Sequence, residues 1–305
     1  MAISAKDVME LRKQTDCGMM ECKKALTQAD GDFEKAIEIL REQGLAAANK
    51  KAGRIAAEGM VYAVSFDNCA VVVEVNAETD FVAKNDKFVA FVKEATQVIM
   101  KQNPADVEAL MACKTENGET VDEALKNLIL VIKENIKVRR FARYEGVCSA
   151  YVHGGGTHGI LVNFETTNGI EAKDEFVTYG KDIAMQVAAA NPGYVDEASV
   201  PAEVVAKEKE IMLAQMAGDP KTANKPEAVK QKMIEGKIKK FFKENCLVDQ
   251  EFVKDSDLTV AQYTAKVAKD LGGDIKIVKF TRFQKGEGLE KRADDFAAEV
   301  ASMVK

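Results

Sequence analysis

The residues of this chain best suited to chemistry are two histidines, His153 and His158, which flank three consecutive glycines. Strand-like segments on both sides predict that these glycines form the turn of a β-hairpin. A zinc ion would need at least one further donor, and Cys148 is a poor choice. We therefore expect no metal site. A histidine at a hairpin tip either contacts another molecule or has no chemical role.

The six cysteines are scattered along the chain without a Cys-x-x-Cys pair. A chain of 305 residues does not need disulfide bonds to compensate for a small core. We therefore expect reduced, buried thiols at Cys17, Cys22, Cys69, Cys113, Cys148 and Cys246.

The sequence motifs of common enzyme sites are absent. There is no P-loop, no Gly-x-Gly-x-x-Gly between a strand and a helix, and no Gly-x-Ser-x-Gly. The glycine-rich stretch at residues 154–159 joins two strands, so it offers no helix N-terminus to a phosphate. Carboxylates are plentiful, but no pair stands out as an acid and a base. We predict a binding protein that is not an enzyme, with no catalytic residue, metal or cofactor.

Composition narrows the choice of partners. The net charge is -6, so a general nucleic-acid or anionic-membrane binder is not expected. With no tryptophan and 7% aromatic residues, little material exists for stacking on bases. A basic cluster around Phe141 is read as a solvated face that offsets nearby acids. The chain has no apolar run near 18 residues and no signal-peptide core at its start, so we expect a cytoplasmic protein.

One polar stretch, residues 76–86, carries an aromatic side chain that local geometry does not require. It follows the β-branched run 71–75 and precedes a helical pattern from Phe88 to Ile99, so we predict a turn between a strand and a helix. Asn and Asp are common in such turns and helix caps. Phe81 either folds back under the helix or projects outward to anchor another molecule.

An internal repeat decides between these alternatives. Residues 59–79 align without a gap to residues 146–166, and both segments read as a hairpin followed by a helix. The next two residues are Asp80-Phe81 in the first copy and Thr167-Asn168 in the second. If the hairpin needed Phe81 for its core, the second copy would carry an apolar substitute. We therefore predict that Phe81 is exposed for a partner.

The remaining elements predict an α+β protein with helical additions. Residues 1–54 read as three short helices, the last ending near Gly44, and Met19 and Met20 are adjacent. At least one of these methionines is therefore exposed, or both wedge between helices. The predicted units are the three-helix head at 1–54, core subdomain N at 55–145, core subdomain C at 146–192 and 237–283, an antiparallel helical hairpin at 193–236, and a C-terminal helical module at 284–305 with Phe296, Val300 and Met303 on one face.

The chain resembles the bacterial translation elongation factor Ts family along nearly its whole length. Two segments carry the resemblance most specifically: residues 11–26, from Leu11 through Gly18-Met19-Met20 to Leu26, and Thr79-Asp80-Phe81-Val82-Ala83-Lys84-Asn85. Further matches are Glu134-Asn135-Ile136, Tyr151-Val152-His153-Gly154, Glu235-Gly236-Lys237, Leu247 with Gln250 and Phe252, and Gly286-Glu287-Gly288 with Asp295-Phe296-Ala297. Lys133 and Lys254 depart from the family pattern, which has small or apolar residues there.

The resemblance implies a guanine-nucleotide exchange factor for the GTPase elongation factor Tu, in its GDP-bound and nucleotide-free forms. It implies a head similar to ubiquitin-associated domains, a core of two subdomains, an inserted hairpin and a C-terminal module. Asp80 and Phe81 would press into the nucleotide domain of the GTPase. The other implied contact residues are Thr79, Val82, Arg12, Met19, Met20, Ile132, His153 and Val253.

Two alternatives remain open at this stage. An adaptor could use the head alone to bind a folded tag, without exchange activity; it would need only residues 1–54. The helical hairpin at 193–236 could pair with a partner or with a second copy of the chain.

Overall fold

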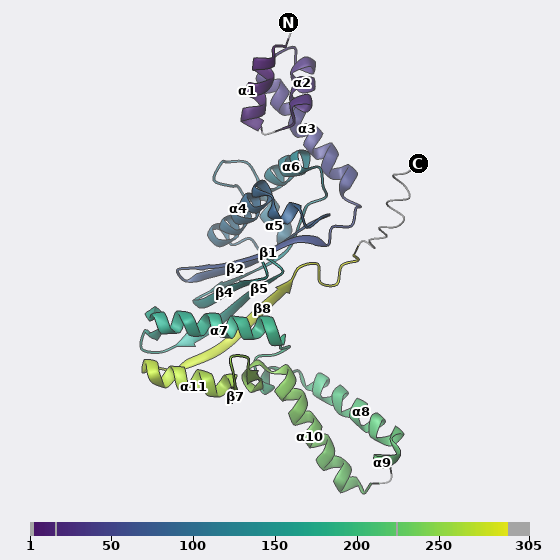
Figure 1. Ribbon diagram of the computed structural model, residues 1–305, viewed down its shortest axis with the longest axis vertical. Helices are drawn as coiled ribbons and strands as arrows, with labels where there is room; N and C mark the ends of the chain where they lie inside the picture. The colour runs from purple at the N-terminus through teal and green to yellow at the C-terminus, as the bar shows by residue number, and fades with distance from the viewer. Residues whose placement is uncertain (1–2, 16, 224, 292–305) are drawn as a thin grey trace.

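The computed structural model describes residues 3–15, 17–223 and 225–291. The elements stack along one long axis: a helical head, helices α4 and α6, two β-sheets, helices α7 and α11, and a projecting helical hairpin (Figure 1). The predicted mixture of helices and sheets is confirmed.

The head consists of α1 (Ala5–Thr15), α2 (Met19–Gln28) and α3 (Phe33–Lys51). Its core includes Leu11, Leu26 and Leu40. The expected end of the third helix near Gly44 is wrong, because α3 continues to Lys51. A Cβ atom at Gly44 would lie 3.3 Å from the carbonyl oxygen of Lys126 in α6. The missing side chain thus lets α3 pack closely against α6.

The first sheet is antiparallel, in the order β1-β2-β3. Helices α4 and α6 cover its outer face around Phe88, Val92 and Leu128. The basic residues around Phe141, expected to form a solvated face, lie on strand β3: Lys137, Arg139, Arg140 and Arg143. The elements of this unit are β1 (Glu58–Phe66), β2 (Cys69–Ala77), η1 (Val82–Lys84), α4 (Asp86–Gln102), α5 (Val107–Ala112), α6 (Val121–Ile132) and β3 (Lys137–Glu145).

The second sheet repeats this plan in the order β4-β5-β8. The repeat is longer than the hairpin and helix seen in the sequence, because each copy also ends with a helix and a third strand. Thr120 and Thr259 form capping boxes at the starts of these two helices. The elements are β4 (Val147–His153), β5 (His158–Thr166), η2 (Ile170–Ala172), α7 (Asp174–Ala190), α11 (Val260–Leu271) and β8 (Ile275–Gln284).

The two sheets pack face to face through aliphatic side chains, including Val61, Val72 and Leu161. A Cβ atom at Gly159 would lie 2.4 Å from Cγ1 of Val61, so the sheets approach too closely there for any side chain. The backbone N–H of Val61 donates to the carbonyl of Gly156 in the β4–β5 turn, at 2.8 Å.

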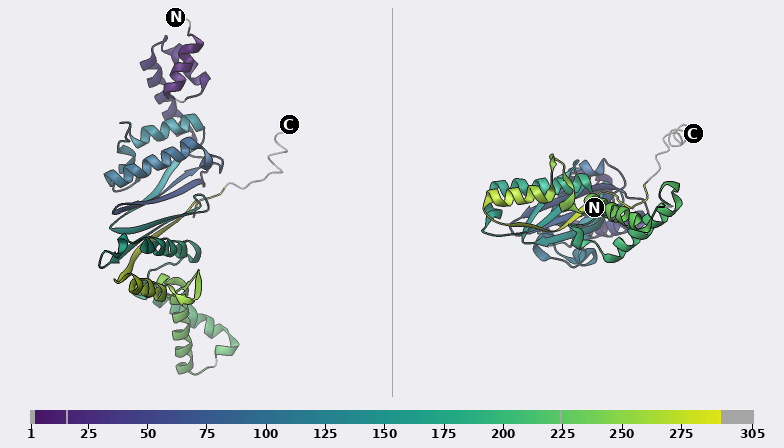
Figure 2. Two further views of the ribbon diagram at one scale, coloured as in Figure 1. Left: turned by 60° about the vertical axis from the view of Figure 1, so that its left-hand side comes forward. Right: turned by 90° about the horizontal axis from the view of Figure 1, so that it is seen from below.

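A helical hairpin projects from the second repeat, away from the sheets (Figure 2). Its helices α8 (Ala202–Gly218) and α10 (Glu227–Asn245) pack through Met212, Met216, Ile234 and Ile238. The expected end at 236 is too early, because α10 and its apolar stripe continue beyond Ile238. Short elements complete the region: η3 (Glu197–Ser199), α9 (Pro220–Ala223), η4 (Leu247–Asp249), β6 (Glu251–Phe252) and β7 (Asp255–Thr259).

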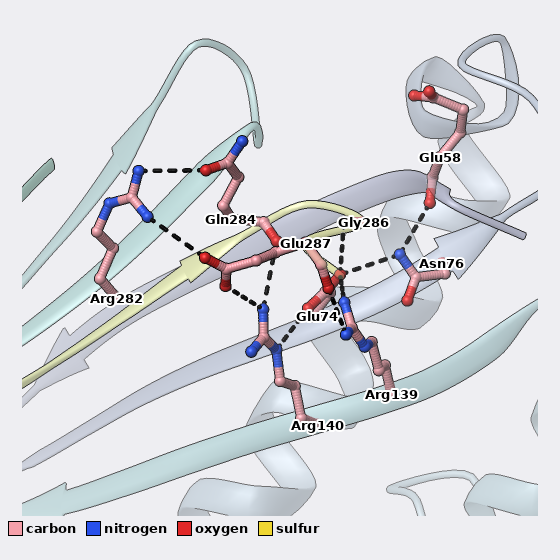
Figure 3. A network of polar contacts seen from close by, with 9 residues as sticks. All are labelled: Glu58, Glu74, Asn76, Arg139, Arg140, Arg282, Gln284, Gly286 and Glu287. Carbon is pink, nitrogen blue, oxygen red and sulfur yellow. Dashed lines mark hydrogen bonds and ion pairs between the residues drawn. The ribbon is translucent and has the colours of Figure 1, made fainter. Parts of the chain in front are cut away.

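The chain leaves β8 across the end of the first sheet, where the buried carboxylate of Glu74 holds it (Figure 3). Glu74 accepts hydrogen bonds from the backbone N–H of Gly286 at 2.8 Å and from Arg140 at 2.6 Å, and pairs with Arg139 at 3.1 Å. Two residues of the basic cluster, Arg139 and Arg140, therefore neutralise a buried acid. The predicted terminal helix with Phe296, Val300 and Met303 lies outside the described residues.

Candidate partner-binding site

The turn between β2 and α4 presents Phe81 to solvent. The ring is 80% exposed, and Asp80 beside it is exposed as well. Asn85 ends the turn by accepting a hydrogen bond from the backbone N–H of Lys87 at 3.0 Å, which caps α4. The prediction that Phe81 points outward is confirmed.

Val82, the next residue, points in the opposite direction. It is 6% exposed and packs in the core beneath α4 with Phe88 and Phe91. In the second repeat Ile170 occupies the matching position and is 1% exposed. The Val82 side chain closes the turn from below and leaves Phe81 free to project, so it is not exposed to a partner in this arrangement; its contact with a partner stays a prediction.

The carboxylate of Glu134 holds the backbone of this turn. Its Oε2 accepts the backbone N–H groups of Glu78 and Thr79 at 3.1 and 3.0 Å, and its Oε1 accepts the Thr79 hydroxyl at 2.7 Å. Thr79 is half-buried by these contacts. Hydrogen bonds to an ionised acceptor are stronger than neutral ones, so Glu134 fixes the segment that leads into Asp80 and Phe81.

The matching turn of the second repeat offers no such ring. Asn168 has a φ of 61°, and its side-chain amide donates to the carbonyl of Gly272 at 2.9 Å. Thr167 accepts the backbone N–H of Asp274 through its hydroxyl at 2.8 Å. Here both residues bind their own chain, whereas the first turn uses Glu134 and leaves its aromatic residue in solvent.

His153 lies at the same end of the sheet pair as Phe81. Glu58 pairs with Ala77 just before the Phe81 turn, and nearby Val61 bonds to Gly156 in the turn that follows His153. His153 is exposed, and its Nδ1 lies 3.0 Å from the hydroxyl of Tyr151. The imidazole is thus accessible to another molecule.

The head contributes an exposed apolar pair. Met19 and Met20 are 47% and 61% exposed at the start of α2, so they do not both wedge between helices. Arg12 on α1 is exposed too. The ammonium group of Lys133 lies 2.8 Å from a carboxylate oxygen of Glu21 on α2, which links the head to the residue before Glu134.

The last two predicted contact residues occupy different environments. Ile132 is half-buried and packs against the core at the end of α6. Val253 is exposed in the β6–β7 turn, where its backbone N–H donates to Oε1 of Gln186 at 2.8 Å. Its neighbour Lys254 donates to the mostly buried Asp182 at 2.6 Å.

Among residues 3–15, 17–223 and 225–291, no cluster of three or more His, Cys, Asp or Glu side chains could hold a metal ion. All six cysteines are free thiols, three of them buried and three half-buried. In these same ranges no helix is long and apolar enough to cross a membrane.

Comparisons with a family model and with known proteins point to the same family. The family model described as elongation factor TS matches residues 78–287. The chain is 47% identical to elongation factor Ts of Syntrophotalea carbinolica, over 100% of both chains. It is also 47% identical to elongation factor Ts of Clostridioides difficile, over 99% of each chain. Elongation factor Ts of Clostridium novyi is 48% identical over 98% of this chain and 97% of its own.

Proposed function

The chain belongs to the elongation factor Ts family, and from this premise we propose that it is a guanine-nucleotide exchange factor for the GTPase elongation factor Tu. It binds the GDP-bound partner, distorts the site that holds Mg²⁺ and the phosphates, and stabilises the nucleotide-free form. GDP then leaves and GTP can bind. The chain acts by binding and makes or breaks no covalent bond.

The observation that carries this proposal is the outward projection of Phe81 from a turn that its own protein holds rigid. The ring is 80% exposed, while the backbone before it donates to Glu134. An apolar side chain that is already exposed, on a backbone that is already held, suits insertion into a pocket of a partner, because binding does not have to order that backbone. Asp80 would accept hydrogen bonds from the partner backbone beside the ring.

Release of the nucleotide requires more binding energy than the contact of Phe81 alone can supply. A factor that prefers the empty GTPase weakens nucleotide affinity by the same ratio, because the coupling of two ligands is reciprocal. Each tenfold weakening needs about 1.4 kcal/mol. Burying one Phe supplies roughly 1.5–3 kcal/mol, which weakens nucleotide affinity about 10- to 100-fold. We propose further contacts with the GTPase from Arg12, Met19, Met20, Ile132, His153 and Val253.

The test is release of labelled GDP from purified elongation factor Tu. The chain is expected to accelerate release at amounts well below one per GTPase, because it dissociates once GTP has rebound. An adaptor that used only residues 1–54 to bind a folded tag would leave the rate of GDP release unchanged. Absence of acceleration at any concentration of the chain would overturn the proposed exchange function.

We further propose that the hairpin of α8 and α10 can pair with a second copy of the chain. Ile211, Leu213 and Val229 are exposed on it, and exposed apolar residues on adjacent helices favour association. Sedimentation equilibrium should then show an average mass that rises with protein concentration. The Leu213→Glu variant should show the monomer mass at every concentration. A mass of 33.3 kDa at every concentration would exclude pairing.

A further inference from the structure

Three consecutive residues between α6 and β3 each hold a different segment of the protein. Lys133 contacts the head, Glu134 contacts the Phe81 turn, and Asn135 contacts the chain that leaves the head. The head and the Phe81 turn are far apart in the sequence. Residues 133–135, which we call the bracket, therefore connect two surfaces proposed to bind the same partner.

Glu134 satisfies the polar groups of the turn that precede Phe81. Its two oxygens accept from two backbone N–H groups and one hydroxyl, at 2.7–3.1 Å. Three such bonds fix the position and the direction of the backbone that enters residue 80. A ring used as a wedge needs this fixed direction, because a misplacement of about 1 Å already weakens an interaction that depends on fit.

Lys133 occupies a backbone position that favours glycine. It ends α6 with a φ of 68°, and the matching residue at the end of α11 is Gly272, with a φ of 76°. A lysine is strained in this left-handed conformation, whereas glycine is not. Its ammonium group nevertheless reaches Glu21, the third residue of α2, which begins with Met19 and Met20.

Asn135 connects the remaining segments. It is buried, its backbone N–H donates to Oε1 of Glu78 at 2.6 Å, and its side-chain amide donates to the carbonyl of Arg54 at 2.7 Å. Arg54 in turn lies 3.4 Å from the same Glu78 oxygen. The chain after α3 is thus tied to the residue before Thr79.

We propose that Lys133 and Glu134 are positioning residues for exchange: they hold the methionine pair of the head and Phe81 in one fixed arrangement, so that both engage elongation factor Tu together. This inference rests on the proposed exchange function. It predicts separate effects, because Lys133 holds the position of the head and Glu134 holds the direction of the Phe81 ring. Loss of Lys133 weakens the affinity for the GTPase, and loss of Glu134 lowers the maximal rate of GDP release.

The first test replaces Lys133 by glycine. Lys133→Gly should leave the melting temperature unchanged or raise it by about 1–3 °C, because backbone strain is relieved. The affinity for nucleotide-free elongation factor Tu should nevertheless fall about two- to fivefold, the effect of one exposed ion pair. Asn103→Gly is the matched control, since Asn103 also ends a helix with a positive φ and lies outside the bracket. It should not change the affinity.

Charge reversal separates positioning from direct contact with the partner. Glu21→Lys and Lys133→Glu should each weaken binding, and the double variant should recover most of the affinity because the ion pair forms again. Single variants that bind like the wild type, or a double variant no better than the weaker single one, would overturn the role of Lys133.

For Glu134 the comparison is between Ala and Gln. Glu134→Ala should lower the maximal release rate at least tenfold at saturating factor. Glu134→Gln should stay within about threefold of the wild type, because its amide can satisfy the same three groups. Equal maximal rates for Ala and wild type would overturn the role of Glu134. The wild-type chain is measured together with every variant. If the wild type does not accelerate GDP release, the proposed exchange function is wrong, and the proposal for the bracket is wrong with it.

Discussion

At the scale of single residues, the site depends on two neighbours that point in opposite directions. Val82 packs beneath α4, and Phe81 stands in solvent above it. A lone exposed aromatic residue is common on protein surfaces. Phe81 differs because its supporting backbone is held on both sides, by Glu134 and by the core contact of Val82.

Val82→Ala tests the contribution of the buried neighbour. Removing two buried methyl groups should lower the free energy of unfolding by about 1–3 kcal/mol, through lost burial and a small cavity. Urea denaturation measures this change. Ala83→Gly in the same turn serves as a comparison at a half-buried residue. If Val82→Ala unfolds at the wild-type urea concentration, Val82 does not support the turn.

The sequence predicted that Phe81 points outward, but it did not predict the contacts of Glu134 and Val82 that hold the backbone beside it. Comparing the repeats was sufficient for the ring, because Asn168 cannot replace an apolar core residue. The inward direction of Val82 was missed, since Gly169 is inserted before the matching Ile170 and hides the correspondence. Glu134 was matched to the family, yet its contact with Thr79 spans 55 positions and has no local pattern.

At the scale of elements, the close packing of the two sheets brings the Phe81 and His153 turns to one end. Gly159 permits this approach, because no side chain separates β5 from Val61 and Val72. The sequence indicated both hairpins and the helix after each one. It did not indicate β3, where Arg139 and Arg140 pair with the buried carboxylate of Glu74.

Gly159→Ala should therefore force the sheets apart. The new Cβ atom would lie 2.4 Å from Val61 Cγ1 and 2.9 Å from Val72 Cγ2, well inside van der Waals contact. We expect a loss of about 1–3 kcal/mol in unfolding free energy from overpacking. Thermal denaturation measures it, with Gly193→Ala as the control because a Cβ atom there meets nothing within 4 Å. Equal melting temperatures for both variants would show that the sheets can adjust.

At the scale of the whole molecule, long-range polar contacts join parts that no local pattern connects. Lys133 and Glu21 are 112 positions apart, and Glu74 and Gly286 are 212 apart. Burial alone would raise the pKa of Glu74, but hydrogen bonds from Gly286, Asn76 and Arg140 hold it below its ordinary value of 4.5. Glu74 thereby fastens the chain after β8 to the first sheet.

This lowered pKa gives a pH dependence with a definite sign. A carboxylate with a lower pKa in the folded state stabilises the fold above its unfolded pKa, and this stabilisation is lost as the pH falls through the folded pKa. The free energy of unfolding should therefore decline below about pH 4.5. Glu74→Gln should cost about 2–4 kcal/mol at pH 7 and flatten that decline, because the arginines lose their buried partner. Urea titrations across this pH range measure the free energy of unfolding of the wild type and of Glu74→Gln. If the two plots of this free energy against pH ran parallel, the role of Glu74 would be contradicted.

The central claim is that the exposed ring of Phe81 drives nucleotide release, and the maximal rate of GDP release tests it most directly. Labelled GDP bound to elongation factor Tu is mixed with saturating wild type, Phe81→Ala or Phe66→Ala. Phe66 is 68% exposed at the opposite end of the first hairpin and serves as the matched aromatic control. Phe81→Ala should release GDP about 10–100-fold more slowly, the effect of roughly 1.5–3 kcal/mol, and Phe66→Ala should match the wild type. Equal maximal rates for Phe81→Ala and the wild type would contradict the claim.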